Sequence, residues 1–134
     1  MNIALIIAGG SGTRMKSQIP KQFITIAEKP IFIYTLEQFE KHSEIDYIQL
    51  VCRDGWQKSI QDFITKFKIT KVKDIVVGGA TRYESIYNGM QSLDWLQDND
   101  VIIVHDSVRP LVSDLSIADT IRVCKENENP MSVV

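Results

Sequence analysis

The stretch that decides the fold is residues 3–14, IALIIAGGSGTR, in which an apolar run leads directly into a glycine-rich loop. A continuous apolar run bounded by glycines is typical of a strand that is buried on both faces of a parallel sheet. The loop that follows, Gly9–Arg14, has little side chain to pack and exposes successive backbone N–H groups. Such a loop suits a phosphate chain, although these residues alone also allow a plain strand-to-helix turn.

Apolar patterns along the rest of the chain alternate between strand and helix. Further strands are expected at Tyr47–Cys52, Asp74–Val77 and Val101–His105. Helices are expected at Ile31–His42 with Pro30 at the first position, at Trp56–Phe67, from the capping box Thr81–Glu84 through Leu93, and at Leu115–Lys125. Four strand–helix repeats predict an α/β fold in which helices cover both faces of a parallel sheet.

The composition excludes several broad classes of protein. The chain has 134 residues, enough for one compact domain, and its net charge of −2 lacks the basic excess of a nucleic-acid-binding protein. No apolar run approaches the roughly 20 residues of a membrane span, and the N-terminal residues do not resemble a secretory signal. Cys52 and Cys124 lack metal-ligand spacing, so we expect reduced packing residues in a cytoplasmic protein.

Three unusual clusters follow predicted strands, namely Gly9–Arg14, Gly78–Arg82 and Asp106–Pro110. Open α/β sheets bind ligands beyond the carboxyl ends of their strands, so the clusters are expected to share one binding edge. The first cluster is neither a dinucleotide fingerprint nor a P-loop, because the third glycine and the Gly-Lys-Ser/Thr are missing. Arg14 and Lys21 could stabilise charge on a phosphate under attack, or could be solvated surface residues.

The three clusters resemble motifs of the polyol-phosphate cytidylyltransferases. The matching segments are Gly9–Met15 with Pro20–Phe23, Gly78–Ile86 and Val104–Pro110, and the resemblance covers the whole chain. It implies a Rossmann-like three-layer sandwich with a mostly parallel sheet, of the nucleotide-diphospho-sugar transferase type. Residues 1–134 would be the nucleotide-binding part of a single domain that is C-terminally incomplete.

The resemblance implies an enzyme that couples CTP to a polyol phosphate and releases pyrophosphate, with Mg²⁺ as cofactor. It implies that Arg14 and Lys21 are catalytic, that Asp106 binds the metal and that Arg109 lies near the polyol phosphate. The residues implied to bind CTP are Ile7, Ala8, Gly9, Gly10, Ser11, Gly12, Thr13, Gly79, Ala80, Thr81, Arg82, Ser85 and Ser107. A homodimer is implied for the full-length protein, and no nucleic-acid or membrane partner is expected.

Some of these residues have a simpler interpretation. Arg82 could be a solvated residue in the first turn of a helix, and Asp106 could cap a turn at the end of a strand. His105 is expected to pack at the sheet edge and not to act as a base, because the attacking phosphate oxygen is already ionised. His42 is expected at the surface.

Two sequence differences between branches of the family indicate which polyol phosphate is the acceptor. Ala80 and the pair Ser107-Val108 resemble the ribitol 5-phosphate enzymes, whereas methylerythritol enzymes often carry an acidic residue and two alanines there. This favours D-ribitol 5-phosphate, used for teichoic acids or capsules, with the 2-C-methyl-D-erythritol 4-phosphate enzyme of isoprenoid synthesis as the alternative.

Two non-catalytic alternatives stay open, a nucleotide-binding fragment and an unrelated α/β binding module. The residues around Ser132–Val134 resemble the start of another strand, and the family's second magnesium carboxylate is not in this chain. We therefore expect residues 1–134 alone to be marginally stable or aggregation-prone because of an open strand edge. The same fragment is expected to bind CTP weakly and to turn over no polyol phosphate.

Overall fold

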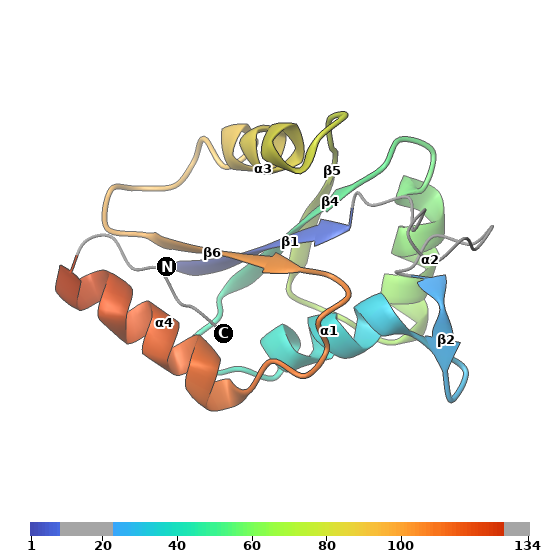
Figure 1. Cartoon of the computed structure of the whole chain (residues 1–134), viewed down its shortest axis with the longest axis horizontal. Coiled ribbons are helices and arrows are strands. Elements are labelled where there is room, and N and C mark those ends of the chain that lie inside the picture. Colours follow the sequence, from blue (N-terminus) through green and yellow to red (C-terminus); the bar gives the residue numbers. More distant parts are fainter. Residues whose placement is uncertain (9–22, 128–134) are drawn as a thin grey trace.

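The structure, a computed structural model, describes residues 1–8 and 23–127 (Figure 1). Within them, one parallel sheet has the spatial order β5-β4-β1-β6. Its strands are β1 (Asn2–Ala8), β4 (Tyr47–Cys52), β5 (Val72–Val77) and β6 (Val101–Asp106). The helices are α1 (Ile31–Glu40), α2 (Gln57–Lys66), α3 (Arg82–Gln91) and α4 (Asp114–Asn127). A small antiparallel pair, β2 (Thr25–Ile26) and β3 (Lys29–Pro30), precedes α1.

Helices cover both faces of the sheet, which confirms the predicted three-layer α/β fold. Figure 1 shows α3 on one side of the sheet and α1 and α4 on the other. Successive residues of a strand point to opposite faces, so all seven residues of β1 are buried. Ala4 and Ile6 belong to the main core with residues of α1, α2 and α4, whereas Leu5 and Ile7 belong to a smaller cluster under α3.

The strand order creates a switch point beside β1. In chain order the sheet begins with β1, adds β4 and β5 on one side, and then adds β6 on the other side of β1. In β1 and β6, Ile7 is paired with Asp106 near the carboxyl ends. Open α/β sheets bind ligands where the direction of strand addition reverses, outside the carboxyl ends. The fold therefore places the candidate site at the ends of β1 and β6.

Helix α3 approaches the sheet closely because Gly89 faces it. A Cβ atom at Gly89 would lie 2.7 Å from Leu5 Cδ1 and 2.7 Å from Val51 Cγ2, which is inside van der Waals contact. The smaller core cluster has Leu5, Ile7 and Val51 as its buried members, with Ile86 and Ile102 packed against it. The absence of a side chain at Gly89 therefore sets the distance between α3 and the sheet.

Gly89→Leu should destabilise the protein although leucine is the better helix former. Overpacking of a filled core costs about 1–3 kcal/mol or more, which exceeds the gain of about 0.8 kcal/mol in helix propensity. Urea titration should show a lower free energy of unfolding. The matched control is Gln91→Leu at an exposed position of the same helix, which introduces the same side chain at nearly unchanged helix propensity and without the clash. Equal stabilities of the two variants would contradict this account of α3 packing.

The β2–β3 hairpin was not predicted from the sequence. Its turn residues Ala27 and Glu28 have φ of 53° and 67°, so the turn uses left-handed backbone without glycine or asparagine. Such turns are usually recognised by Asn-Gly or Asp-Gly, and this signal is missing here. Pro30 ends β3 and is the N-cap of α1, not its predicted first helical residue, so the helix begins one residue later than predicted, at Ile31.

An aromatic cluster around Phe23 holds the segment that precedes β2. The Phe23 ring centroid lies 4.7 Å from that of Trp56, 5.6 Å from that of Phe32 and 6.2 Å from that of Phe63. Aromatic pairs at such separations stabilise a fold beyond their area burial. The cluster joins the segment before β2 to α1 and α2.

Most element boundaries agree with the sequence prediction, and His42 is the main correction. Helix α1 ends at Glu40, and His42 is 7% exposed and not at the surface. Its Nε2 donates to the Asp114 carbonyl oxygen at 3.0 Å, and its Nδ1 accepts from the Glu44 N–H at 3.2 Å. The two bonds satisfy both ring nitrogens of a neutral histidine, which is why burial is tolerated.

Candidate functional site

The carboxyl end of β6 is tied to β1 and to α1 by the backbone of Ser107. The Ser107 N–H donates to the Ile7 carbonyl oxygen at 3.0 Å, one residue beyond the end of β6. The Ser107 carbonyl oxygen accepts from Thr35 Oγ1 of α1 at 2.6 Å, and both residues are buried. The backbone of Ser107, the residue that follows Asp106, is therefore held from two sides.

The second predicted cluster, Gly78–Arg82, connects β5 to α3 and is held by the first turn of that helix. Gly78 N–H continues the sheet by donating to the Cys52 carbonyl oxygen at 2.8 Å. Gly79 N–H donates to Ser85 Oγ at 3.2 Å, and Ala80 N–H donates to Glu84 Oε2 at 2.7 Å. The conformation of this loop is thus fixed by two side chains of α3.

Thr81 caps α3 as its sequence pattern predicts. Its hydroxyl accepts from the Glu84 N–H at 3.1 Å, which satisfies one of the free donors at the helix start. Glu84 differs from the usual capping box, because its carboxylate binds the N–H of Ala80 and not that of the cap residue itself. Glu84 therefore binds a backbone N–H of the loop that precedes the cap residue.

Close packing against α3 explains the paired glycines. A Cβ atom at Gly78 would lie 2.5 Å from Ser85 Oγ, and one at Gly79 would lie 2.3 Å from Glu84 Cβ. Neither position has room for a side chain. The glycines therefore let the loop lie against the helix, whether or not a ligand also approaches their backbone.

An ion pair joins the second cluster to the third. Arg82 Nη1 of α3 lies 3.6 Å from Asp106 Oδ2 of β6, with the side chains 54% and 32% exposed. A partly exposed pair of this kind contributes on the order of 1 kcal/mol or less to stability, so both groups are available to a ligand. Asp106 is paired with Ile7 in the sheet, so the ion pair lies near the carboxyl end of β1.

The turn after β6 is closed by backbone groups and by His105. Arg109 N–H donates to the Asp106 carbonyl oxygen at 3.3 Å, and His105 Nε2 donates to the Arg109 carbonyl oxygen at 3.0 Å. The His105 ring lies 5.1 Å from the Phe39 ring, and burial lowers the pKa of His105 below its usual value. His105 therefore packs at the sheet edge, as expected.

The Arg109 side chain is exposed beside this turn. Its guanidinium has no hydrogen bond or ion pair to any residue in the described ranges 1–8 and 23–127. A free guanidinium at a binding edge suits a phosphate or carboxylate ligand, because its N–H fork matches their oxygen pairs.

Several predicted site residues precede or fall within a stretch that the structure does not describe. Gly9, Gly10, Ser11, Gly12, Thr13, Arg14 and Lys21 lie outside the described residues, so their roles stay predictions. Ile7 and Ala8 end β1 and are 5% and 1% exposed. The Ile7 carbonyl oxygen already accepts from Ser107, and its side chain packs under α3.

The described residues offer a metal ion one carboxylate and not a complete protein cage. No group of three or more His, Cys, Asp or Glu side chains in residues 1–8 and 23–127 could hold a metal. Magnesium commonly takes one or two carboxylates together with waters and substrate phosphates, so Asp106 fits such a shared site. The Arg82 guanidinium beside Asp106 indicates that this carboxylate attracts a cation.

Sequence reasoning missed Thr35 and Glu84. Both act on the backbone of predicted site residues, Thr35 on Ser107 and Glu84 on Ala80. For Thr35 a signal exists, because a hydroxyl stands on the apolar stripe of α1 formed by Phe32, Leu36 and Phe39. For Glu84 the capping pattern predicted the start of the helix but not the hydrogen bond to the Ala80 N–H.

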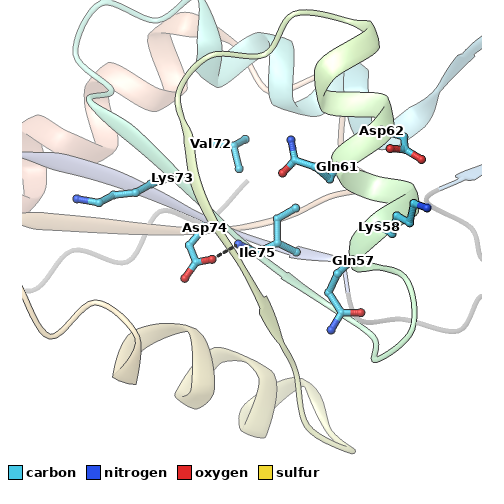
Figure 2. Close-up of a pocket in the computed structure, with 8 residues that line it drawn as sticks. All are labelled: Gln57, Lys58, Gln61, Asp62, Val72, Lys73, Asp74 and Ile75. Atoms are coloured by element: carbon cyan, nitrogen blue, oxygen red, sulfur yellow. Dashed lines mark hydrogen bonds between the residues drawn. The ribbon is translucent and has the colours of Figure 1, made fainter.

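A separate hollow lies beside the edge strand β5 and contains none of these residues. Figure 2 shows its lining residues on α2 and β5. Its volume is about 370 Å³. Its lining is Gln57, Lys58, Gln61, Asp62, Val72, Lys73, Asp74 and Ile75. None of the predicted site residues contributes to it, and its charges of both signs are ordinary for a solvated surface. The hollow is therefore not the candidate site.

The cysteines are structural, as predicted. Cys52 is buried at the end of β4, and burial raises the pKa of its thiol to about 11. A thiol in that state is a poor nucleophile at neutral pH. Cys124 is half-buried against the main core, and both cysteines are free.

Among the described residues, no helix is long and apolar enough to cross a bilayer.

The family model and similar relatives of this chain agree on one protein family. Residues 2–134 match the family model described as 2-C-methyl-D-erythritol 4-phosphate cytidylyltransferase. The chain is 42% identical over 133 residues to the ribitol-5-phosphate cytidylyltransferase of Lacticaseibacillus paracasei, covering 98% of this chain and 57% of that protein. It is 41% identical over 125 residues to the 2-C-methyl-D-erythritol 4-phosphate cytidylyltransferase of Clostridium botulinum, covering 93% and 54%.

A solved structure agrees with the fold. The 4-diphosphocytidyl-2C-methyl-D-erythritol synthase from Anaerococcus prevotii superposes with a TM-score of 0.75 at 29% identity. The match covers 95% of this chain and 52% of that protein. The chain thus spans little more than half the length of the curated relatives that it matches.

Proposed function

We propose that the protein transfers the cytidylyl group of CTP to a polyol phosphate, because the chain belongs to the family of 2-C-methyl-D-erythritol 4-phosphate cytidylyltransferases. The structural observation that carries the proposal is the Arg82–Asp106 pair, which brings two motif clusters together at the carboxyl end of β1. This is the position where a Rossmann-like sheet binds a nucleotide. The activity is assigned to the whole protein.

The loop at Gly79–Thr81 is proposed to hold the cytosine and ribose, with Ser107 beside them. The loop is pre-formed, because Ser85 and Glu84 fix its N–H groups. Ser85 is buried and its oxygen is already occupied by Gly79, so it would shape the loop more than touch the base. The glycine-rich segment Gly9–Thr13, with Ile7 and Ala8 before it, is proposed to cradle the triphosphate.

Asp106 is proposed to hold Mg²⁺ together with phosphate oxygens of CTP. Bound there, the ion would neutralise phosphate charge and orient the triphosphate. The donor set fits this use, since one partly exposed carboxylate lies at the carboxyl end of β6. Arg82 would then be free of its ion pair and could turn to the nucleotide phosphates.

The reaction requires positioning and charge stabilisation more than acid–base chemistry. An oxygen of the polyol phosphate attacks the α-phosphorus of CTP, the bond from that phosphorus to the bridging oxygen breaks, and pyrophosphate leaves with the electron pair. Arg14 and Lys21 are proposed to stabilise the charge that develops on the α-phosphate. Arg109, whose guanidinium is free among the described residues, is proposed to hold the acceptor phosphate.

D-ribitol 5-phosphate is the acceptor that we favour. Ala80 and Ser107-Val108 support this choice by their resemblance to ribitol-phosphate enzymes, as does the name of the Lacticaseibacillus relative. The alternative acceptor, 2-C-methyl-D-erythritol 4-phosphate, is supported by the family description and by the Clostridium relative of nearly equal identity.

The test is pyrophosphate release by the natural full-length protein with Mg²⁺ and each acceptor. We expect turnover with CTP and ribitol 5-phosphate, and a kcat/KM at least about tenfold lower with methylerythritol 4-phosphate, as one well-placed contact provides. ATP in place of CTP is the nucleotide control and should support little release. Reversed acceptor preference would identify the methylerythritol enzyme. Binding of CTP without turnover on either acceptor would contradict the proposed activity.

A further inference from the structure

We propose that Thr35 of α1 is a positioning residue for the turn that carries Asp106 and Ser107. The inference rests on the proposed function, because it assigns the turn to nucleotide and metal binding. Thr35 would act through the backbone of Ser107 and would touch neither substrate nor metal.

The hydroxyl of Thr35 is placed where an apolar side chain would be expected. The residue is 0% exposed and lies on the helix stripe with Phe32, Leu36 and Phe39, which are equally buried. A threonine inside a helix can satisfy its hydroxyl with the carbonyl one turn earlier. Here Thr35 Oγ1 donates to the Ser107 carbonyl oxygen, 72 residues away, at 2.6 Å.

This bond completes a clamp on the backbone of one residue, Ser107. The N–H of Ser107 donates to the Ile7 carbonyl oxygen of β1, and its C=O accepts from Thr35 of α1. The direction of the chain immediately after Asp106 is therefore set by two elements that are both part of the core. Within residues 1–8 and 23–127, the Asp106 side chain has only the partly exposed pair with Arg82 to hold it. Its orientation thus depends on the backbone that the clamp fixes.

A second contact of α1 supports the same turn. The His105 ring packs on Phe39 of α1, and its Nε2 donates to the Arg109 carbonyl oxygen. Thr35 and Phe39 are one turn apart on the helix, so a single face of α1 supports both ends of the turn. Of the two contacts, the Thr35 hydroxyl is the one that can be removed with little change of shape.

The test compares Thr35→Val and Thr35→Ser in the full-length protein. Valine keeps the shape but leaves the buried Ser107 carbonyl oxygen without its donor, whereas serine keeps the donor. Removal of groups that orient metal ligands typically costs about 10–100-fold in metal affinity or activity. We therefore expect Thr35→Val to weaken Mn²⁺ binding, followed by electron paramagnetic resonance without nucleotide, by about tenfold. Thr35→Ser should recover most of the affinity.

Thr120→Val is the matched control, because Thr120 Oγ1 donates to the Ser116 carbonyl oxygen within α4 at 2.8 Å. It should leave Mn²⁺ affinity and turnover unchanged. All assays are run well below the melting temperature of each variant, so that lost stability does not pass for lost affinity.

The Mn²⁺ binding measurement separates the positioning role of Thr35 from the proposed cytidylyl transfer. Weaker Mn²⁺ binding by Thr35→Val with rescue by serine supports the positioning role, even if neither polyol phosphate proves to be a substrate. Mn²⁺ affinities that are equal in wild type and Thr35→Val, or the absence of Mn²⁺ binding by wild type, would overturn it. Absence of turnover by a wild-type protein that binds Mn²⁺ would count against the proposed function alone.

Discussion

Asp106→Asn in the full-length protein is expected to lower magnesium-dependent turnover by at least about a hundredfold while the fold is kept. Asparagine has the shape of aspartate but not the charge that a divalent ion needs, and loss of one preorganised electrostatic contact typically costs that much. The fold should survive because the turn is closed by the backbone oxygen of Asp106, which accepts from Arg109. In the part of the chain that the structure describes, the Asp106 side chain makes only a partly exposed pair with Arg82.

This prediction is checked by pyrophosphate release over a range of Mg²⁺ concentrations and by thermal melting followed by circular dichroism. The control is Asp119→Asn, which removes another exposed carboxylate paired with an arginine, Arg122, at 3.3 Å. That variant should keep full activity. If Asp106→Asn unfolds instead, the carboxylate is a structural cap and the metal role is wrong.

Arg14→Ala and Lys21→Ala are each expected to reduce kcat by about a hundredfold or more. Both residues lie outside the described residues, so the expectation comes from their place beside the glycine-rich loop. Groups that stabilise charge developing in a transition state contribute mainly to turnover, because that charge is absent in the ground state. CTP affinity should therefore fall much less than kcat.

Single-turnover rates and CTP dissociation constants of the two variants separate these effects. Lys58→Ala is a suitable control, because Lys58 is an exposed lysine in the hollow beside β5. It removes the same charge at a residue that belongs to none of the three motif clusters. Equal losses of affinity with unchanged turnover would show that Arg14 and Lys21 bind ground-state phosphate only.

The fold could be predicted because its strands and helices have strong local signals. The run at Ile3–Ala8, the strand at Tyr47–Cys52 and the cap at Thr81 all lie where the sequence placed them. The β2–β3 hairpin could not be predicted, because Ala27 and Glu28 adopt left-handed backbone without a glycine to indicate it. There the surrounding structure outweighs the residues' own preferences.

The sequence motifs name the residues of the candidate site, but the contacts between these residues could not be predicted from the sequence. Arg82 and Asp106 were each identified by motif, yet their pairing depends on how far α3 lies from β6. The same holds for Thr35 and Ser107, which are 72 residues apart, and for the burial of His42 against α4. Such contacts follow from the three-dimensional packing of whole elements and leave no periodic trace in the sequence.

The unequal cores on the two faces of the sheet have a consequence for motion. Helix α3 is held by a cluster with three buried members, whereas α1, α2 and α4 share the larger core. Segments with few buried contacts open locally at lower free energy than the rest of a domain. The loop at Gly79–Thr81 is held by side chains of α3, so it shares this low opening free energy. A nucleotide bound there would slow amide hydrogen exchange in α3 much more than in β1, and would spend part of its binding free energy on that ordering.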